Sequence, residues 1–286
     1  MQDGKMLDFL KNVLVNQPLD WLRLTTHRLD IYDESLAKTQ FLEQFNDLYA
    51  NNNASAEALA ALPTAFDYIR LGHPLSCVLE WSIAHQNNLK AEAVVSFSSS
   101  TIPMMAVLRK NLFDKRPTRI LFDDQLPNCF DAKSLKEVYG YSFETSKVEA
   151  NAAIDPFDGS TIFVAKSSNF ELVNCPKNVD FYLTVQEDLG SVLQVVNPAA
   201  ESYISEIQHV RRRETIAMTP SNCLLALERM LGKEGKSDFS SKEANKAAVV
   251  ASINKVTGTT TKALVASSGL SIQYAILMGL IDEAIE

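Results

Sequence analysis

Long uncharged apolar runs are missing from this chain of 286 residues. No stretch reaches the roughly 18 apolar residues that a membrane-spanning helix needs. The start of this sequence has no long apolar core and carries Asp3, Asp8 and Lys11, so it does not have the pattern of a signal peptide. These absences predict a cytoplasmic protein without a membrane partner.

Metal-binding and disulfide patterns are missing as well. The chain has four histidines, and none of them has metal-ligand spacing. The four cysteines lie roughly fifty residues apart, which is typical of neither a zinc site nor a disulfide framework: Cys77, Cys129, Cys175 and Cys223. We therefore expect no bound metal and four reduced thiols.

Positive charge is scarce, because 27 Lys and Arg stand against 35 Asp and Glu and give a net charge of −8. Nucleic-acid binding needs clustered positive charge, so no nucleic-acid partner is expected. The one dense basic run, Arg211–Arg213, is followed directly by Glu214. A solvated helix face is the favoured interpretation of this run, and a site for an anion or a carboxylate is the alternative.

The spacing of the apolar residues changes clearly along the chain. Residues 1–62 carry apolar residues at helical spacing and predict an N-terminal helical arm. Residues 63–231 alternate strand-like and helix-like segments, which predicts an α/β domain with a mostly parallel sheet and flanking helices. Residues 232–246 are polar and carry glycine and serine, so we expect a linker there. Residues 247–286 predict a helix and then the start of a second βα unit.

Within the α/β domain, the sequence predicts strands at residues 92–97, 118–122, 141–148 and 178–185, and a turn followed by a buried strand within residues 155–169. Serine-rich turns follow two apolar runs, first at Ser98–Thr101 and again at Ser267–Gly269. Each turn opens a predicted helix, whose N-terminal N–H groups and partial positive charge suit a phosphate. Helix capping by serine, with no ligand, is the alternative interpretation.

The two serine turns also resemble each other. Aligning Ser98 with Ser267 gives four identities over residues 98–108. A recurring βα design and a tandem duplication both explain this likeness. Under duplication the second turn is the better copy, because Gly269 lets the backbone approach a phosphate closely. The chain would then hold one strand and one helix of a second copy.

The segment before the first turn carries the most specific pattern. Tyr68-Ile69-Arg70, Gly72-His73-Pro74 and Leu79-Glu80 together resemble the "Y-x-R-x-x-N-P-T…LE" segment of the Cys/Met-metabolism family. These are fold-type-I pyridoxal-phosphate (PLP) enzymes of the cystathionine γ-synthase and γ-lyase group. The resemblance implies that Tyr68 and Arg70 hold the cofactor phosphate of a neighbouring subunit, as a planar guanidinium can do.

The resemblance assigns roles to further residues. It implies that the small turn Ser99, Ser100 and Thr101 holds the phosphate within the same subunit, as Ser268 and Gly269 would do in the second copy. "LPNCFDAKSL" resembles the loop whose aromatic residue stacks on the cofactor, which would be Phe130. "NVDFYLTV" resembles the strand carrying the aspartate that pairs with the pyridine nitrogen, which would be Asp180.

The chain departs from the family where the cofactor-binding lysine should follow that aspartate. No lysine lies between Lys177 and Lys233, and Lys262 in "TTTK" stands in the wrong order along the chain. Three hypotheses follow. The chain is a PLP-dependent lyase or transferase of sulfur amino-acid metabolism, or the N-terminal part of one. It is a non-catalytic domain of the same ancestry, for dimerisation or regulation. Or it is an unrelated phosphate-binding α/β domain.

The first two hypotheses also imply partners. An active enzyme would take a sulfur-containing amino acid as its substrate. Either form would work as a homo-oligomer or together with a second, catalytic half.

Overall fold

A computed structural model describes residues 2–23, 34–63, 70–149, 152–167, 169–172, 175–234, 242–266 and 268–285. Tyr68 lies outside the described residues, so its predicted role is not addressed by the structure. Within the described part, no helix combines the length and the apolar character needed to cross a membrane.

A six-stranded sheet forms the centre of the molecule, with the strand order β1-β6-β5-β4-β2-β3. The strands are β1 (Val94–Phe97), β2 (Thr118–Phe122), β3 (Phe143–Lys147), β4 (Ser160–Lys166), β5 (Phe181–Gln186) and β6 (Gly190–Val195). Only β6 runs against the others, because it pairs antiparallel with both β1 and β5. The predicted fold class, α/β with a mostly parallel sheet and flanking helices, is confirmed.

Strand β6 is the element that the sequence analysis missed. It returns directly from β5 through a tight turn, in which Gln186 pairs with Gly190. Gly190 has φ +127°, and a side-chain Cβ there would lie 2.2 Å from the Phe97 carbonyl oxygen. Only glycine fits this approach, and the turn places β6 between β1 and β5.

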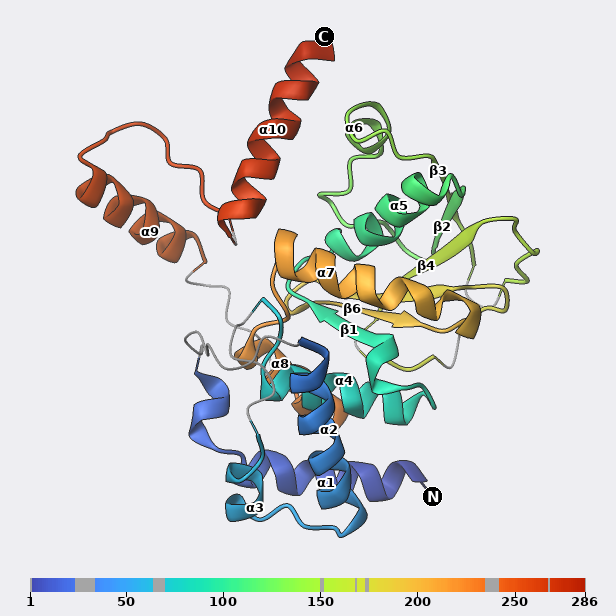
Figure 1. Cartoon of the computed structure of the whole chain (residues 1–286), viewed down its shortest axis with the longest axis vertical. Helices are drawn as coiled ribbons and strands as arrows, with labels where there is room; N and C mark the ends of the chain where they lie inside the picture. Colours follow the sequence, from blue (N-terminus) through green and yellow to red (C-terminus); the bar gives the residue numbers. More distant parts are fainter. Residues whose placement is uncertain are drawn as a thin grey trace.

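Helices cover both faces of the sheet (Figure 1). On one face, α5 (Ile102–Asp114) and α7 (Ile204–Glu214) pack over the strands, with Val95 and Leu193 pointing into that core. On the other face, α4 (Pro74–Gln86) and α8 (Pro220–Met230) pack in a core that includes Val94 and Val192. The side chains of neighbouring strand residues alternate between the two cores, as a pleated sheet requires.

The N-terminal residues form helices, as predicted: α1 (Gln2–Asn16), α2 (Glu34–Ala50) and α3 (Ala56–Ala60), with a short 3-10 helix at Leu19–Leu22. They do not stand apart from the α/β domain. Phe9 of α1 and Phe45 of α2 contact each other at 5.6 Å between ring centroids, and both rings lie against Trp81 of α4. The helical segment is therefore a layer packed on α4.

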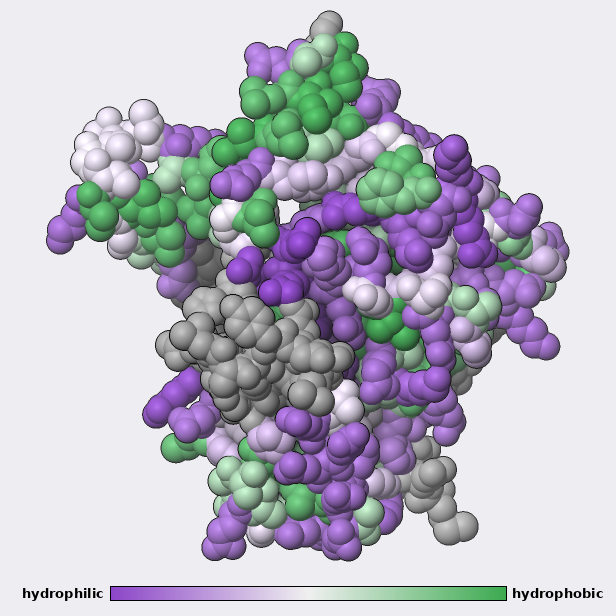
Figure 2. Space-filling model, viewed as in Figure 1, coloured by the Kyte–Doolittle hydropathy of each residue, from purple (hydrophilic) through white to green (hydrophobic). Residues whose placement is uncertain are grey.

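The C-terminal part of the chain holds α9 (Lys242–Thr257) and α10 (Gly269–Ile285), so α9 begins inside the predicted linker. Residues 263–266, which the sequence predicts as a buried strand, form no strand and belong to no sheet. Their backbone has no neighbouring strand to pair with, and Leu264 is 69% exposed. Figure 2 shows apolar side chains gathered on α10, which extends away from the sheet. The structure thus contains the predicted helix of a second βα unit without its strand.

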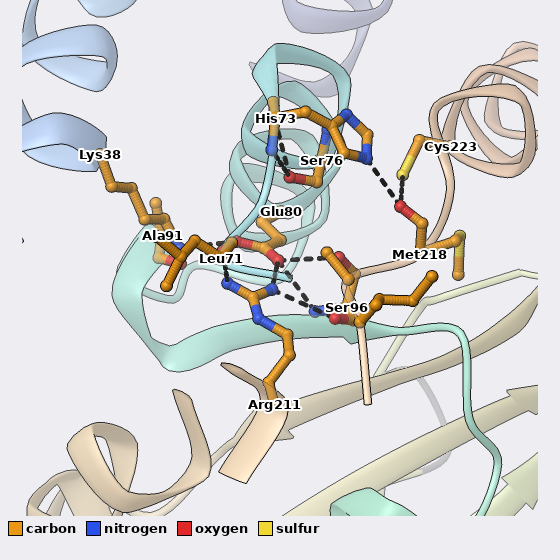
Figure 3. Close-up of polar contacts among 12 residues, drawn as sticks. Lys38, Leu71, His73, Ser76, Glu80, Ala91, Ser96, Arg211, Met218 and Cys223 are labelled. Atoms are coloured by element: carbon orange, nitrogen blue, oxygen red, sulfur yellow. Dashed lines mark hydrogen bonds and ion pairs between the residues drawn. The ribbon is translucent and has the colours of Figure 1, made fainter. Parts of the chain in front are cut away.

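A buried carboxylate joins the helical layer to the sheet (Figure 3). Glu80 of α4 is fully buried, and its Oε1 accepts hydrogen bonds from the Ser96 N–H at 2.9 Å and the Ser96 hydroxyl at 2.8 Å. Arg211 of α7 donates to the same oxygen at 2.7 Å, and Lys38 of α2 donates to Oε2 at 2.7 Å. One side chain therefore connects α2, α4, α7 and β1.

Two cations keep Glu80 ionised inside the protein. Burial alone would raise the pKa of Glu80, but Lys38 and Arg211 outweigh this effect and lower the pKa to about 2. The Arg211 guanidinium also donates to the carbonyl oxygens of Ser96 and Leu71, so its donors are satisfied on several sides. A buried charge is tolerated only with such partners, which fixes the relative placement of the four elements.

The His73 side chain caps the N-terminus of α4. Nδ1 accepts a hydrogen bond from the Ser76 N–H at 3.2 Å, and the Ser76 hydroxyl accepts one from the His73 N–H at 2.9 Å. Nε2 lies 2.7 Å from the Met218 carbonyl oxygen, so Nε2 carries the proton and donates. Both ring nitrogens are used by a neutral imidazole, and this reciprocal arrangement is a capping box.

The neutrality of His73 predicts a pH dependence of stability. Burial lowers the pKa of His73 from 6.5 to about 4. Below pH 6.5 the unfolded chain binds a proton at this residue and the folded chain does not, so the free energy of unfolding falls as the pH drops from 6.5 to 4. The loss from this group is about 3 kcal/mol.

Denaturant unfolding at several pH values measures this effect. His73→Asn keeps an N-terminal cap but cannot titrate. We expect a shallower fall in unfolding free energy for this variant than for the unmodified protein between pH 6.5 and 4. Parallel curves for the two proteins would show that His73 does not titrate as described.

Candidate functional site

In a fold of this class, ligands bind at the carboxyl ends of the parallel strands. The chain leaves β2 for β3 on one side and later returns to β4 on the other side of β2. At such a change of direction the connections diverge, and a crevice opens between the strand ends. In this protein the crevice lies between the ends of β2 and β4.

A cavity of about 380 Å³ occupies this crevice. Ser100 after β1, the loop 125–129 after β2, Lys166 at the end of β4, and Val185 and Glu187 at the end of β5 line it. Leu126, Pro127 and Val185 give it an apolar wall, and the remaining lining residues carry hydroxyl, amide, thiol, amine and carboxylate groups. We call this cavity the edge pocket.

Two opposite charges lie in the edge pocket. The Lys166 amine lies 3.0 Å from a Glu187 carboxylate oxygen and 3.7 Å from an oxygen of Asp124. The hydrogen bond that the Lys166 amine donates to Glu187, and the negative charge of Glu187, raise the pKa of Lys166. Lys166 therefore stays in the charged form, which binds anions.

The hydroxyl groups of the first serine turn are used within the protein. The Ser98 hydroxyl donates to the carbonyl oxygens of Ile216 and Ala217, at 3.1 and 2.9 Å. The Ser99 hydroxyl oxygen accepts from the N–H groups of Thr101 and Ile102, at 3.3 and 3.2 Å. These contacts join β1 to the segment after α7 and cap α5, as the structural interpretation of the turn anticipated.

The start of α5 consequently offers few donors to a phosphate. The N–H groups of Thr101 and Ile102 already bond to Ser99, and Pro103 has no N–H. A phosphate site at a helix N-terminus depends on unpaired backbone N–H groups. Of the predicted phosphate ligands in this turn, only Ser100 faces the edge pocket.

The second serine turn is likewise a helix cap. The Ser268 hydroxyl oxygen accepts from the Ser271 N–H at 3.1 Å, and the Ser271 hydroxyl oxygen accepts from the Ser268 N–H at 2.9 Å. Ser268 also donates to the Arg213 carbonyl oxygen at 3.2 Å, and Gly269 is exposed. The two turns therefore lie against the same short segment, residues 213–217, and neither is a phosphate cradle in this conformation.

The other residues that the resemblance singled out are not gathered at the edge pocket. Phe130 packs on Phe143 with 5.7 Å between ring centroids, on the side of the core beneath α5 and α7. Arg70 directly precedes Leu71, the residue whose carbonyl oxygen accepts from Arg211 beside Glu80. Neither Phe130 nor Arg70 lines the edge pocket.

Asp180 lies at the amino end of β5, the end of the strands opposite to the edge pocket. It precedes β5, and its carboxylate accepts from the Thr161 N–H at 2.8 Å and from the Asn197 side chain at 2.6 Å. The serine turn follows Phe97, which pairs with Ser191 at the start of β6, whereas Phe181 pairs with Val195 at its end. Asp180 therefore lies opposite residue 196 and Ser98 opposite residue 190, and at ~3.4 Å per residue this separates them by ~20 Å along β6. The two do not share a site.

These positions do not fit a bound PLP cofactor. The N–H groups of Thr101 and Ile102 at the start of α5 already bond to Ser99. Asp180, the expected partner of the ring nitrogen, lies at the amino end of β5. The Lys166 amine in the edge pocket is charged. We therefore derive no chemical step through PLP.

Sequence reasoning missed the charged residues of the edge pocket. Lys166 and Glu187 stand at the ends of two predicted strands, and the rule that ligands bind at the carboxyl ends of parallel strands was the signal that could have located them. The order of the family motif, which places the lysine after the aspartate, does not lead to Lys166.

Comparisons with known proteins give a distant likeness. No family model matches the chain, and no curated protein matches its sequence. Among solved structures, the chain is similar to metB from Corynebacterium glutamicum, with a TM-score of 0.42 and 13% identity. It is also similar to cystathionine gamma-lyase from Lactobacillus plantarum complexed with L-serine, with a TM-score of 0.40 and 12% identity.

Each of these two alignments covers 78% of this chain and 63% of the other chain. The chain thus spans less than two thirds of the length of the solved structures it matches. A likeness this distant assigns no role to any residue of this chain.

The misfit to PLP predicts the outcome of a cofactor-binding test. We expect that adding PLP to the purified chain produces no new visible absorbance band, and that borohydride reduction fixes the cofactor to no single lysine peptide. Lys166→Ala serves as the matched control for labelling of surface amines. A stoichiometric adduct that this variant abolishes would contradict the account and place the cofactor in the edge pocket.

Proposed function

We propose that the edge pocket binds a small amino acid in its zwitterionic form, and that the chain works as a non-catalytic binding or regulatory domain. The proposal rests on the pair of opposite charges, Lys166 and Glu187, which lie at the ends of two neighbouring strands and line one cavity. Lys166 would hold the carboxylate of the ligand, and Glu187 its ammonium group.

Opening this pair for a ligand costs little. The side chains of Lys166 and Glu187 are 39% and 65% exposed, and an exposed ion pair of this kind contributes about 0–1 kcal/mol. A zwitterion that enters between them replaces one ion pair by two charge-assisted contacts. Asp124, at 3.7 Å from the Lys166 amine, adds a second carboxylate near the ammonium position.

The remaining lining favours an amino acid with an apolar side chain. Leu126, Pro127 and Val185 form the apolar wall, while the amides of Gln125 and Asn128 can orient polar groups of the ligand. Sulfur-containing amino acids, whose thioether or thiol is apolar and polarisable, fit this wall. The sequence resemblance to the Cys/Met-metabolism family makes them the first ligands to test.

The alternative function, a PLP-dependent lyase or transferase of sulfur amino-acid metabolism, has one supporting observation. The Lys166 amine and the Ser100 residue line the same cavity, so an amine is present beside the first serine turn. Its raised pKa argues for the binding function, because a neutral amine is needed for attack on a carbonyl group. The PLP labelling test described above separates the two functions.

Calorimetric titration with methionine, cysteine and cystathionine tests the proposal. We expect Lys166→Gln and Glu187→Gln each to weaken binding at least about tenfold, because each removes one charge-assisted contact with the ligand. Lys133→Gln is the matched control, since Lys133 is also an exposed lysine paired with a carboxylate but lies in α6 (Ala132–Glu137). Equal affinities for all the variants, or no binding of any zwitterion, would contradict the proposal.

A further inference from the structure

Glu187, one of the two charges of the edge pocket, lies in the turn between β5 and β6. It directly follows Gln186, the last residue of β5, and its carboxylate lies 3.0 Å from the Lys166 amine. The Glu187 side chain is 65% exposed, so packing around the side chain does little to fix its direction. The place of this charge therefore depends on what holds the backbone of the turn.

Arg229 of α8 binds the residues on both sides of Glu187. Its Nη1 donates to one carboxylate oxygen of Asp188 at 3.0 Å and to the Gln186 side-chain oxygen at 3.2 Å, and its Nη2 donates to the second oxygen of Asp188. Two donors on one carboxylate fix the direction of the contact as well as its length. The neighbours of Glu187 are thus bonded to α8, whereas Glu187 itself lines the edge pocket.

The turn has further attachments that do not involve Arg229. The Asn222 side-chain amide of α8 donates to the Leu189 carbonyl oxygen at 2.9 Å, and the Leu189 side chain is buried in the core shared with α4 and α8. The Leu189 N–H also donates to the Gln186 carbonyl oxygen at 3.1 Å, which closes the turn. The turn should therefore persist without Arg229, and the loss of Arg229 should change mainly the direction of Glu187.

Stabilisation of the fold is the other role that this contact could have. The side chains of Arg229 and Asp188 are 20% and 28% exposed, so solvent reaches the pair. An ion pair that solvent reaches contributes little to the free energy of unfolding. Its geometric effect, in contrast, falls on the pocket residue that lies between its two partners along the chain.

We propose that Arg229 is a positioning residue of the edge pocket. By holding Gln186 and Asp188 against α8, it directs the Glu187 carboxylate toward Lys166 and sets the distance between the two charges. Arg229 does not line the pocket, so it acts through Glu187 and not on a ligand. The use of Glu187 by an amino-acid ligand rests on the proposed function, whereas the placement of Glu187 beside Lys166 does not.

The pKa of the Lys166 amine, followed by NMR titration of its Cε signal, reports this placement without a ligand. Glu187 and, at 3.7 Å, Asp124 face this amine, and Glu187 has the larger effect on its raised pKa. We expect Arg229→Gln to lower the pKa of Lys166 toward its ordinary value, because Glu187 turns away. Removing a nearby cation by itself raises the pKa of a lysine, so a fall cannot result from the change in charge.

Two variants serve as controls for this titration. Arg229→Lys keeps the charge but lacks the planar pair of donors, so it should restore only part of the raised pKa. Arg116→Gln removes an arginine whose guanidinium donates to the Gly159 carbonyl oxygen, just before β4, and should leave the pKa of Lys166 unchanged. An unchanged or higher pKa of Lys166 in Arg229→Gln would overturn the inference.

Calorimetric titration with methionine separates this inference from the proposed function. If both hold, Arg229→Gln lowers the pKa of Lys166 and also weakens methionine binding by about three- to tenfold, since Glu187 no longer faces the ammonium group. A lowered pKa in the variant, together with no methionine binding to the unmodified protein, would support the role of Arg229 and contradict the proposed function.

Discussion

The Glu80 carboxylate is the constraint on which the arrangement of this protein depends. It is fully buried in α4, and it meets Lys38 from α2, Arg211 from α7 and the Ser96 amide from β1. An ionised group without such partners would destabilise the folded state by several kcal/mol. The chain must therefore bring together segments more than 100 residues apart, since Glu80 and Arg211 are separated by 131 positions. The helical layer, the sheet and the helices on its second face are placed by the same group.

The residues that stabilise the fold are different from those that are available to a ligand. The residues that most resemble a cofactor site in the sequence serve the framework: His73 caps α4, Ser99 caps α5, and Asp180 joins β5 to the neighbouring strand end. The charges left for a ligand are Lys166 and Glu187, at the carboxyl edge where the strand order changes direction. They are exposed and weakly coupled, which suits reversible binding.

Much of the fold could be predicted from the sequence, because its signals are local. Strands β1, β2, β4 and β5 are short apolar runs, and the capping residues before α3 and α8 are visible as Ser55 and Thr219. Strand β6 was missed because its identity depends on a tight turn that only Gly190 permits. The predicted strand at residues 263–266 has the right composition but no neighbouring strand in the described part of the chain, and pairing is a tertiary property that composition does not encode.

The candidate site was harder to predict, because sequence similarity identifies residue types and not their neighbours. Asp180 matches a family pattern, yet the pairing of β5 with β6 places it at the end of the strands opposite to the serine turn. Lys166 matches no motif, and only the sheet order brings it to Ser100 and Glu187. Lys38 was unremarkable in the sequence as one polar position of an amphipathic helix, and its role appears only when α2 meets α4.

The most direct test of the central claim is the free energy of unfolding of Glu80→Met alone and of the combined variant Lys38→Met, Glu80→Met, Arg211→Met. If Glu80 holds the layers together, the single change leaves two buried cations without their partner and destabilises the protein by about 3–5 kcal/mol. The combined variant removes the stranded charges, so its loss should be smaller than that of the single variant. A single-variant loss below about 1 kcal/mol, the size expected of an exposed pair such as Lys90 with Glu201, would contradict the account.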